Sequence, residues 1–266
     1  MAERSVLVET AGGIGTIKLN RPETLNAFDT KLIADTFCAI EELGSDSSVK
    51  VVVITGVGKT FSAGADIKGR FLANIEKRKS GDLNIALRES NLAAGLHSMM
   101  NLGKPLIAAV NGLAIGLGCT ISLACDMRIA SEDARFGFGF VKMALTPEFG
   151  SSYFLPRLIG VGRTLELLYS GRLLGAQEAK DMGMVNNVVP LEKLPAAVDT
   201  LARNLAQGPS ISLKLIREGI YQGMQVDLDT ALKWEYFALN TCFSTDDHEE
   251  AVRAFVEKRQ PTFRGR

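Results

Sequence analysis

The sequence has 266 residues, 46% of them hydrophobic and 23% charged, which is enough for a globular protein with a sizeable buried core. Thirty basic residues balance thirty acidic ones, so the overall charge favours neither nucleic acid nor an acidic membrane surface as a partner. His97 and His248 lie far apart and the four cysteines form no CxxC pair, so neither a metal site nor a histidine-based triad is expected. The first ten residues contain no apolar signal core, and we expect a cytoplasmic protein with reduced thiols.

Strand-like and helical patterns alternate along the first two thirds of the chain. Gly12 and Gly13 separate two β-rich runs and predict a hairpin. Apolar residues at helical spacing begin after Asp29, a plausible N-cap, and end near the next glycine. A polar helical stretch over residues 68–101 carries a glycine and charges that predict a break near 79–82. Strands are expected at 5–10, 14–20, 49–55, 105–110, 126–131, 134–138 and 185–190, and further helices at 163–171 and 176–183.

One uncharged segment, residues 105–125, is long enough to span a bilayer. Asn111 and Gly112 interrupt it with a turn signal, and Gly116 and Gly118 weaken a helix in its middle. A buried strand, a tight turn and a buried helix are therefore expected in place of a membrane span.

Helical patterns dominate from about Leu191 onward, and no low-complexity linker precedes them. We therefore expect a core over residues 1–190 and a helical region over 191–266 that packs on it. Several apolar residues of this region have few partners on their own helical segments, so they are expected to bury surface against a neighbouring copy of the chain. They are Leu232, Trp234, Phe237, Leu239 and Phe243.

Two loops rich in small residues each follow an apolar strand: "FSAGAD" at 61–66 and "NGLAIGLG" at 111–118. Small residues let a ligand approach backbone N–H groups, and a helix start leaves several of these groups unpaired. Two such donors aimed at one point would form an oxyanion hole, which stabilises developing negative charge. Close packing of the backbone is the alternative explanation for the glycines. Neither loop has a phosphate-loop pattern, and the second is a poor dinucleotide fingerprint.

Four segments, in this order, resemble the crotonase or enoyl-CoA hydratase/isomerase superfamily: "LNRPETLNAF", "VVVITGVGKTFSAGADIK", "KPLIAAVNGLAIGLGCTISLACDMRIAS" and "DDHEEAVRAFVEKRQPTF". The resemblance covers nearly the whole chain. It implies an α/β fold, a crotonase-like spiral of ββα units followed by a C-terminal helical trimerisation region, assembled as a homotrimer or homohexamer. Such proteins act in fatty-acid β-oxidation and related acyl-CoA metabolism.

The resemblance also implies the ligand and its site. The substrate is an acyl-CoA thioester, CoA is part of that substrate, and no separate cofactor, metal, nucleic acid or membrane partner is implied. The thioester oxygen would lie between the backbone N–H groups of Ala65 and Leu117. The substrate-binding residues carried over are Ala63, Gly64, Asp66, Ile67, Gly116 and Phe140. The helical stretch over 68–101 is expected to close the acyl pocket and so to set the chain length.

Two positions depart from the pattern of typical hydratases. Hydratases resemble "GGGCE" and "GQPE" where this chain has "GLGCT" and "GFGF", so Thr120 and Phe140 stand in place of two glutamates. Hydration needs a positioned water together with removal and delivery of a proton. Threonine is not an acid at neutral pH, and phenylalanine cannot transfer protons. A two-glutamate hydratase mechanism is therefore not expected.

The segment "TPEFGSS" around Glu148 resembles the Δ3,Δ2-enoyl-CoA isomerase branch of the family, in which one acid moves the proton. Moving a double bond takes a proton from C2 and returns one to C4, which a single carboxylate can do while an oxyanion hole holds the dienolate. The alternative from the local pattern is a helix start, with Thr146 as N-cap, Pro147 as first helical residue and Glu148 in the first turn. The two interpretations are compatible, and catalytic Glu148 is preferred.

We therefore expect an isomerase that converts a 3-enoyl-CoA to the 2-trans-enoyl-CoA. Related enolate chemistry on a ring-derived thioester from aromatic degradation and a non-catalytic acyl-CoA-binding protein remain as alternatives. Arg21 could contact the CoA phosphates, although Glu23 stands where some relatives carry lysine. Lys258 and Phe263 could contact CoA bound to a neighbouring subunit, but surface charge and core filling explain them equally well.

Overall fold

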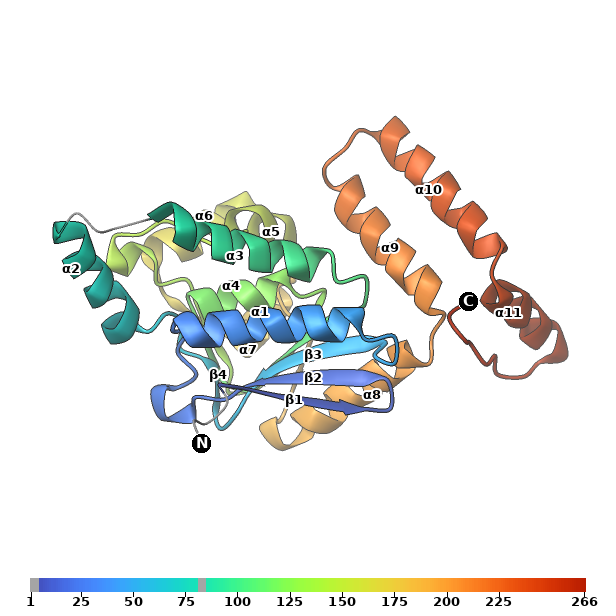
Figure 1. Cartoon of the computed structure of the whole chain (residues 1–266), viewed down its shortest axis with the longest axis horizontal. Helices are drawn as coiled ribbons and strands as arrows, with labels where there is room; N and C mark the ends of the chain where they lie inside the picture. The colour runs from blue at the N-terminus through green and yellow to red at the C-terminus, as the bar shows by residue number, and fades with distance from the viewer. Residues whose placement is uncertain (1–4, 81–84) are drawn as a thin grey trace.

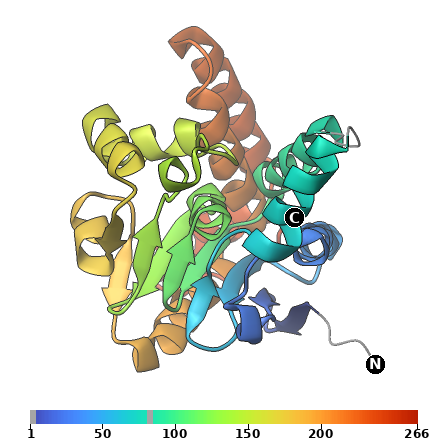
Figure 2. The ribbon, with the colours of Figure 1, turned by 90° about the vertical axis from the view of Figure 1, so that its left-hand side faces the viewer.

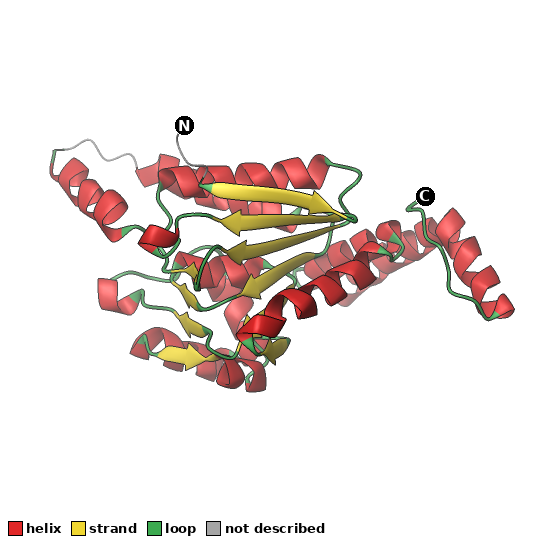
Figure 3. Cartoon of the chain, turned by 90° about the horizontal axis from the view of Figure 1, so that it is seen from below, coloured by secondary structure: helices red, strands yellow, loops and turns green. Residues whose placement is uncertain are grey.

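Two β-sheets with helices on both sides form the body of the chain in the computed structural model, which describes residues 5–80 and 85–266 (Figures 1 and 3). The strands are β1 (Val6–Ala11), β2 (Ile14–Leu19), β3 (Val51–Gly56), β4 (Thr60–Ser62), β5 (Leu106–Val110), β6 (Leu113–Ile115), β7 (Met127–Ser131), β8 (Arg135–Gly137), β9 (Leu173–Gly175) and β10 (Asn187–Val189). The helices are α1 (Thr30–Ser45), α2 (Ala73–Lys79), α3 (Ile85–Met100), α4 (Leu117–Ala124), α5 (Ser151–Ile159), α6 (Val161–Ser170), α7 (Ala176–Asp181), α8 (Leu194–Ala206), α9 (Ser210–Gly223), α10 (Leu228–Phe243) and α11 (Asp246–Glu257). A π-helix at Ile67–Leu72 precedes α2, and short 3₁₀ turns lie at Pro22–Thr24, Val141–Met143 and Leu191–Lys193.

Strand pairing repeats along the chain. The described strands form a six-stranded sheet in the order β1-β2-β3-β5-β7-β10 and a four-stranded sheet in the order β4-β6-β8-β9. The pairs β3–β4, β5–β6 and β7–β8 each place their first strand in the larger sheet and their second in the smaller one. Each step to the next parallel strand is therefore one turn of a spiral, which is the expected arrangement of ββα units.

The sheet strands follow directly from the sequence patterns. β1 and β2 form an antiparallel hairpin around Gly12 and Gly13, as predicted. β3 is buried along nearly its whole length, as its continuous apolar run predicted for a strand covered on both faces. Helix α1 covers one face of the larger sheet, and α8 covers the other through Leu194, Val198 and Ala202.

The uncharged segment 105–125 folds as β5, a turn, β6 and α4, which confirms the predicted strand, turn and buried helix. Within the part of the chain that the structure describes, no helix is long and apolar enough to cross a bilayer. Among the described strands, β10 pairs with β7 and forms the edge of the larger sheet, in the segment 185–190 where a strand was predicted.

The predicted helix boundaries need two adjustments. Asp29 is the N-cap of α1, its carboxylate accepting a hydrogen bond of 2.7 Å from the Leu32 N–H, but the helix continues past Gly44 to Ser45. The predicted single stretch over 68–101 is a π-helix followed by α2 and α3. Helix α2 ends at Lys79, where a break was predicted, and residues 81–84 lie outside the described part.

Helices α9, α10 and α11 extend away from the body (Figure 1). One buried ion pair ties their base to it: the Arg217 guanidinium of α9 lies 3.0 Å from the Asp126 carboxylate and also donates to the Met99 carbonyl at 2.7 Å. The Tyr221 hydroxyl donates to the same carboxylate at 2.8 Å. Because α8 packs on the sheet, the projecting part of the C-terminal region begins at α9, and the division of the chain near residue 190 stays a prediction.

Candidate active site

The two loops rich in small residues lie directly against each other. A Cβ atom on Gly64 would lie 2.7 Å from the Ile115 carbonyl oxygen, and one on Gly118 would lie 2.6 Å from the Ser62 Cβ atom. Gly64 also has a φ of 92°, which disfavours any other residue. The glycines therefore permit the close contact that the packing explanation required, and that contact brings both loops to one place, at the start of α4.

Each loop presents a backbone N–H group at this place. Leu117 is the first residue of α4, where N–H groups have no partner within the helix. Ala65 forms a parallel bridge with Phe28, in which Phe28 donates to the Gly64 carbonyl at 2.6 Å and accepts from the Asp66 N–H at 3.0 Å. In a parallel bridge the flanking residues make these bonds, so the N–H of Ala65 itself points to the opposite side. The bonds of the bridge and of the helix thus leave both N–H groups unused, and their role as the two donors of an oxyanion hole stays a prediction.

Glu148 lies on the loop between β8 and α5. Helix α5 begins only at Ser151, so Thr146 is not an N-cap and Glu148 is not a first-turn residue, which corrects the helix-start interpretation. Phe149 and Gly150 have φ angles of 53° and 70°, and this left-handed pair separates Glu148 from the helix. The Glu148 carbonyl accepts hydrogen bonds from the Ser151 N–H at 3.1 Å and the Ser151 hydroxyl at 2.6 Å, which fixes the end of the loop.

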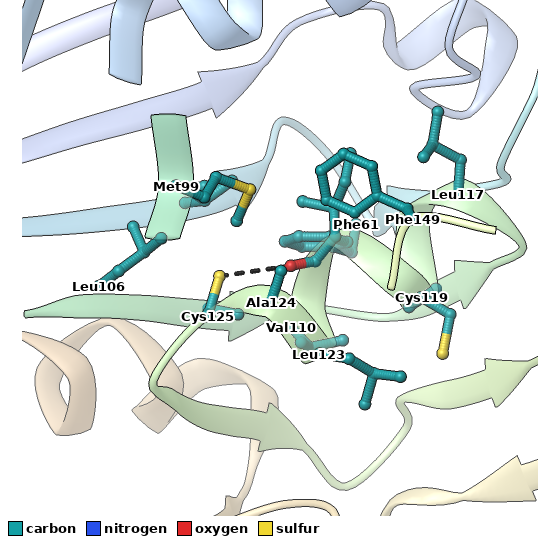
Figure 4. Close-up of a cluster of buried hydrophobic side chains, with 14 of the residues drawn as sticks. Phe61, Met99, Leu106, Val110, Leu117, Cys119, Leu123, Ala124, Cys125 and Phe149 are labelled. Carbon is teal, nitrogen blue, oxygen red and sulfur yellow. Dashed lines mark hydrogen bonds between the residues drawn. The ribbon is translucent and has the colours of Figure 1, made fainter. Parts of the chain in front are cut away.

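A left-handed conformation costs a bulky residue such as Phe149 roughly 1–2 kcal/mol. Its buried ring stacks on that of Phe37 from α1, with centroids 5.7 Å apart and planes inclined by 13°. Figure 4 shows Phe149 close to Leu117 on one side of the buried cluster, with Met99 and Leu106 on the other. Packing of the aromatic ring therefore holds the backbone conformation that presents the Glu148 side chain.

A cavity of 620 Å³ joins the two loops to Glu148. Its lining residues come from the π-helix, α3, the start of α4 and the loops around them. Figure 2 looks at this end of the body, with α2 and α3 on one side of α4 and α5 and α6 on the other. Its lining contains most of the predicted site residues: Ala63, Gly64, Ala65, Ile67, Gly116, Leu117, Phe140 and Glu148. Asp66 is the exception among them, because it is not one of the described lining residues and its carboxylate instead caps the following π-helix at the Gly69 N–H.

Several further lining residues were not among the predicted site residues, including Arg70, Phe71, Leu92 and Leu96. Leu92 and Leu96 are four residues apart, so helical periodicity identifies one apolar face of α3. Helical periodicity does not show which part of the protein this face of α3 contacts. Arg70 lies on the π-helix, and its proximity to Glu148 depends on how that helix packs.

Burial raises the pKa of the Glu148 carboxyl above its usual range, and the positive charge of Arg70 partly opposes this effect. A carboxylate that is partly removed from water, with an apolar surround and one nearby cation, is a stronger base than an exposed one. Such a group suits proton abstraction from a carbon acid.

The two positions that carry glutamate in typical hydratases supply no proton-transfer group. Thr120 is fully buried in α4, and its hydroxyl donates to the Leu117 carbonyl at 3.2 Å. Phe140 adds apolar surface to the cavity lining. Glu148 is therefore the carboxylate among the described residues of this lining.

Arg21 is engaged inside the protein. Its guanidinium donates to the Ala27 carbonyl at 2.7 Å and lies 3.2 Å from Asp29 and 3.7 Å from Asp66. A contact between Arg21 and CoA phosphates stays a prediction, as do the contacts suggested for Lys258 and Phe263.

Within residues 5–80 and 85–266 no group of three or more His, Cys, Asp or Glu residues could hold a metal ion. The expectation that CoA enters only as part of the substrate likewise stays a prediction.

Comparisons with known proteins agree with the fold. The family model for enoyl-CoA hydratase/isomerase matches residues 9–266. The chain is 40% identical to short-chain-enoyl-CoA hydratase of Clostridium acetobutylicum, over 98% of this chain and 97% of that protein. It is 34% identical to 1,2-epoxyphenylacetyl-CoA isomerase of Escherichia coli, over 98% of each. The solved enoyl-CoA hydratase of Bacillus anthracis matches it with a TM-score of 0.91 and 37% identity, over 98% of this chain and 100% of that one. The chain therefore belongs to the enoyl-CoA hydratase/isomerase family, as its sequence motifs predicted.

Proposed function

We propose that this protein is an enoyl-CoA isomerase that converts 3-enoyl-CoA thioesters to 2-trans-enoyl-CoA with Glu148 as its single acid–base residue. The observation that carries the proposal is the composition of the cavity lining. Among its described residues it contains one partly desolvated carboxylate, from Glu148, together with Ala65 and Leu117, whose N–H groups we propose as the oxyanion donors, and the apolar Phe140 at one of the two hydratase positions.

The reaction follows from this arrangement. The thioester oxygen accepts hydrogen bonds from the Ala65 and Leu117 N–H groups, which lowers the energy of the dienolate. The Glu148 carboxylate takes a proton from C2, the electron pair delocalises into the thioester and the double bond, and the same carboxyl group returns the proton to C4. The double bond then lies between C2 and C3, conjugated with the carbonyl, and Glu148 is again a carboxylate.

The hydratase names of several relatives suggest addition of water as the competing reaction. A two-glutamate hydratase needs an acid at each of the positions that Thr120 and Phe140 occupy. Neither side chain can act as a general acid or base at neutral pH, so this chain departs from such relatives where hydration chemistry would take place. The single-carboxylate isomerisation needs neither position.

A second candidate reaction uses the same enolate chemistry on a ring-derived acyl-CoA. The specific support is the 34% identity to 1,2-epoxyphenylacetyl-CoA isomerase over nearly the whole chain. A non-catalytic acyl-CoA-binding role is the third candidate. Turnover of 3-hexenoyl-CoA, followed as the absorbance of the conjugated product, supports the 3-enoyl-CoA isomerase. Binding of a CoA thioester without turnover of 3-hexenoyl-CoA or of a ring-derived acyl-CoA supports the non-catalytic role.

The pH dependence of turnover should depend on Arg70. Glu148 must be deprotonated to act as a base, so kcat/KM falls as the pH drops through its raised pKa. The Arg70 charge lowers that pKa, so the Arg70→Met variant is expected to lose activity at a higher pH than the wild type. Arg70→Lys keeps the charge and should keep the profile close to that of the wild type. Profiles of kcat/KM against pH that coincide for all three proteins would contradict the coupling.

We also propose that the protein assembles as a trimer or hexamer through its helical C-terminal region. Leu232, Phe237, Leu239 and Phe243 are all exposed on the single chain, whereas Trp234 is half-buried against Phe237. Exposed apolar surface of this extent marks an interaction site, and its burial is worth roughly 25 cal/mol per Å². Analytical ultracentrifugation at micromolar concentration is expected to show a trimer or a multiple of it. Sedimentation as a 28.7 kDa species alone would contradict assembly.

The cysteines support a reducing compartment, and we propose the cytoplasm. All four are free thiols in the structure, with Cys119 and Cys125 buried and Cys38 exposed. Burial raises the pKa of Cys119 and of Cys125 to about 12, so neither forms a reactive thiolate at neutral pH. These two therefore act as small apolar core residues.

A further inference from the structure

A second cavity lies beside the candidate active site, between α1 and α3. It measures 510 Å³ and shares the side chains of Arg70 and Leu92 with the first cavity. Its other described lining residues are Thr30, Ile33, Ala34, Phe37, Cys38, Glu41, Ala94 and Gly95. Cys38 and Glu41 are exposed, so this cavity extends from the neighbourhood of the active site to the surface.

The stacked rings of Phe37 and Phe149 stand between the two cavities. Phe149 lines the first cavity and Phe37 lines the second, and both residues are only 7% exposed. The Phe37 ring also lies against the backbone of α3, since a Cβ atom on Gly95 would lie 2.3 Å from it. The Phe37 ring is thus held between Gly95 of α3 and Phe149 of the loop that carries Glu148. The stacked rings of Phe37 and Phe149 form a wall between the two cavities.

This wall adjoins the apolar part of the first cavity. Phe149 directly follows Glu148, and Phe71, Leu92 and Leu96 add apolar surface to the same lining. A thioester held by the Ala65 and Leu117 N–H groups with its C2 and C4 near Glu148 would direct its remaining carbons onto this surface. Further methylene groups would then meet the stacked rings.

We propose that the Phe37–Phe149 stack ends the acyl compartment and restricts the protein to short acyl chains, by closing off the second cavity. Helix α1 thereby contributes to substrate selection through Phe37, a residue that lies outside the first cavity's lining. The inference rests on the proposed acyl-CoA site, but it does not depend on which reaction that site catalyses.

Binding of saturated acyl-CoA thioesters tests the wall without any turnover, because these compounds can be neither isomerised nor hydrated. Calorimetric titration would compare hexanoyl-CoA with decanoyl-CoA on the wild type and on Phe37→Ala. Each methylene group that becomes buried is worth roughly fourfold in affinity. We expect the wild type to gain nothing from the four extra methylene groups. In Phe37→Ala the Kd ratio of decanoyl-CoA to hexanoyl-CoA should fall by roughly tenfold or more.

Ile40→Ala is the matched control, since Ile40 is fully buried on the same helix and is not among the described residues that line either cavity. It should keep the wild-type ratio while removing a comparable amount of core packing. Should Phe37→Ala fail to fold, Phe37→Leu keeps an apolar side chain without the stacked ring and is expected to shift the ratio in the same direction.

Three results would overturn the inference. The first is a folded Phe37 variant that binds hexanoyl-CoA and retains the wild-type ratio. The second is a wild type that already binds decanoyl-CoA more tightly by the full methylene increment. The third is a wild type that binds neither thioester, which would overturn the acyl-CoA site as well. Binding without turnover of 3-hexenoyl-CoA would remove only the isomerase proposal, and the ratio would still decide whether the wall exists.

Discussion

Replacement of Glu148 by glutamine is expected to lower kcat for 3-enoyl-CoA isomerisation by roughly 10²- to 10⁴-fold. Glutamine keeps the size and most hydrogen-bonding capacity of glutamate but cannot accept the C2 proton. Because the same carboxyl group is also assigned delivery of the proton to C4, the loss should lie toward the upper end of this range. Initial rates with 3-hexenoyl-CoA would measure it.

The stability of this variant provides an independent check. Burial raises the pKa of Glu148, so the folded protein is stabilised by this group below the pKa of the unfolded chain and loses that contribution as the pH rises through the folded value. At neutral pH the neutral glutamine avoids the cost of burying a charge. The thermal midpoint of Glu148→Gln should therefore equal or exceed that of the wild type.

Two further measurements separate base loss from general damage. Thr120→Ala is the control, because the Thr120 hydroxyl donates to the Leu117 carbonyl and no proton transfer is assigned to it. It should retain most of the activity. Exchange of the C2 proton of an acyl-CoA in D2O reports abstraction directly. If Glu148→Gln exchanged this proton at the wild-type rate, Glu148 would not be the base.

The Ala65→Pro substitution should cost at least roughly 10²-fold in kcat, the scale for losing one oxyanion donor. Proline removes the Ala65 N–H, whereas the bridge to Phe28 uses the Gly64 carbonyl and the Asp66 N–H and can remain. Ala65→Gly keeps the donor and is the matched control, expected to retain most of the activity.

Proline also restricts the preceding residue, and Gly64 has a φ of 92°, so folding must be compared by circular dichroism and thermal unfolding. A well-folded Ala65→Pro protein with normal turnover would place the oxyanion hole elsewhere. Loss of activity in both Ala65 variants would indicate that loop shape, rather than the donor, had been changed.

Local chemistry made much of the fold predictable. The glycine pair at Gly12 and Gly13 specifies the hairpin, Asp29 supplies a side-chain cap, and the turn at Asn111 and Gly112 divides the uncharged segment into strands and a helix. Each of these signals acts over a few residues, so the surrounding fold does not alter it. Gly64 and Gly118 were informative for a different reason, because the close contact between their two loops leaves no room for a Cβ atom.

The remaining features depend on packing between distant segments. The start of α5 at Ser151 could not be predicted, because stacking on Phe37 from α1 supports the left-handed conformation of Phe149. Arg70 and Leu92 reach the cavity only through the placement of the π-helix and α3. Arg21 looked available for phosphates until the positions of Asp29 and Asp66 were known.

The most direct test of the proposed function supplies the purified protein with two substrates in parallel. With 3-hexenoyl-CoA, the absorbance of a conjugated 2-enoyl thioester should rise as the double bond moves. With crotonyl-CoA, that absorbance should stay constant, because Thr120 and Phe140 provide no acid or base for adding water. Loss of crotonyl-CoA absorbance together with no change in 3-hexenoyl-CoA would show a hydratase and contradict the single-carboxylate isomerase.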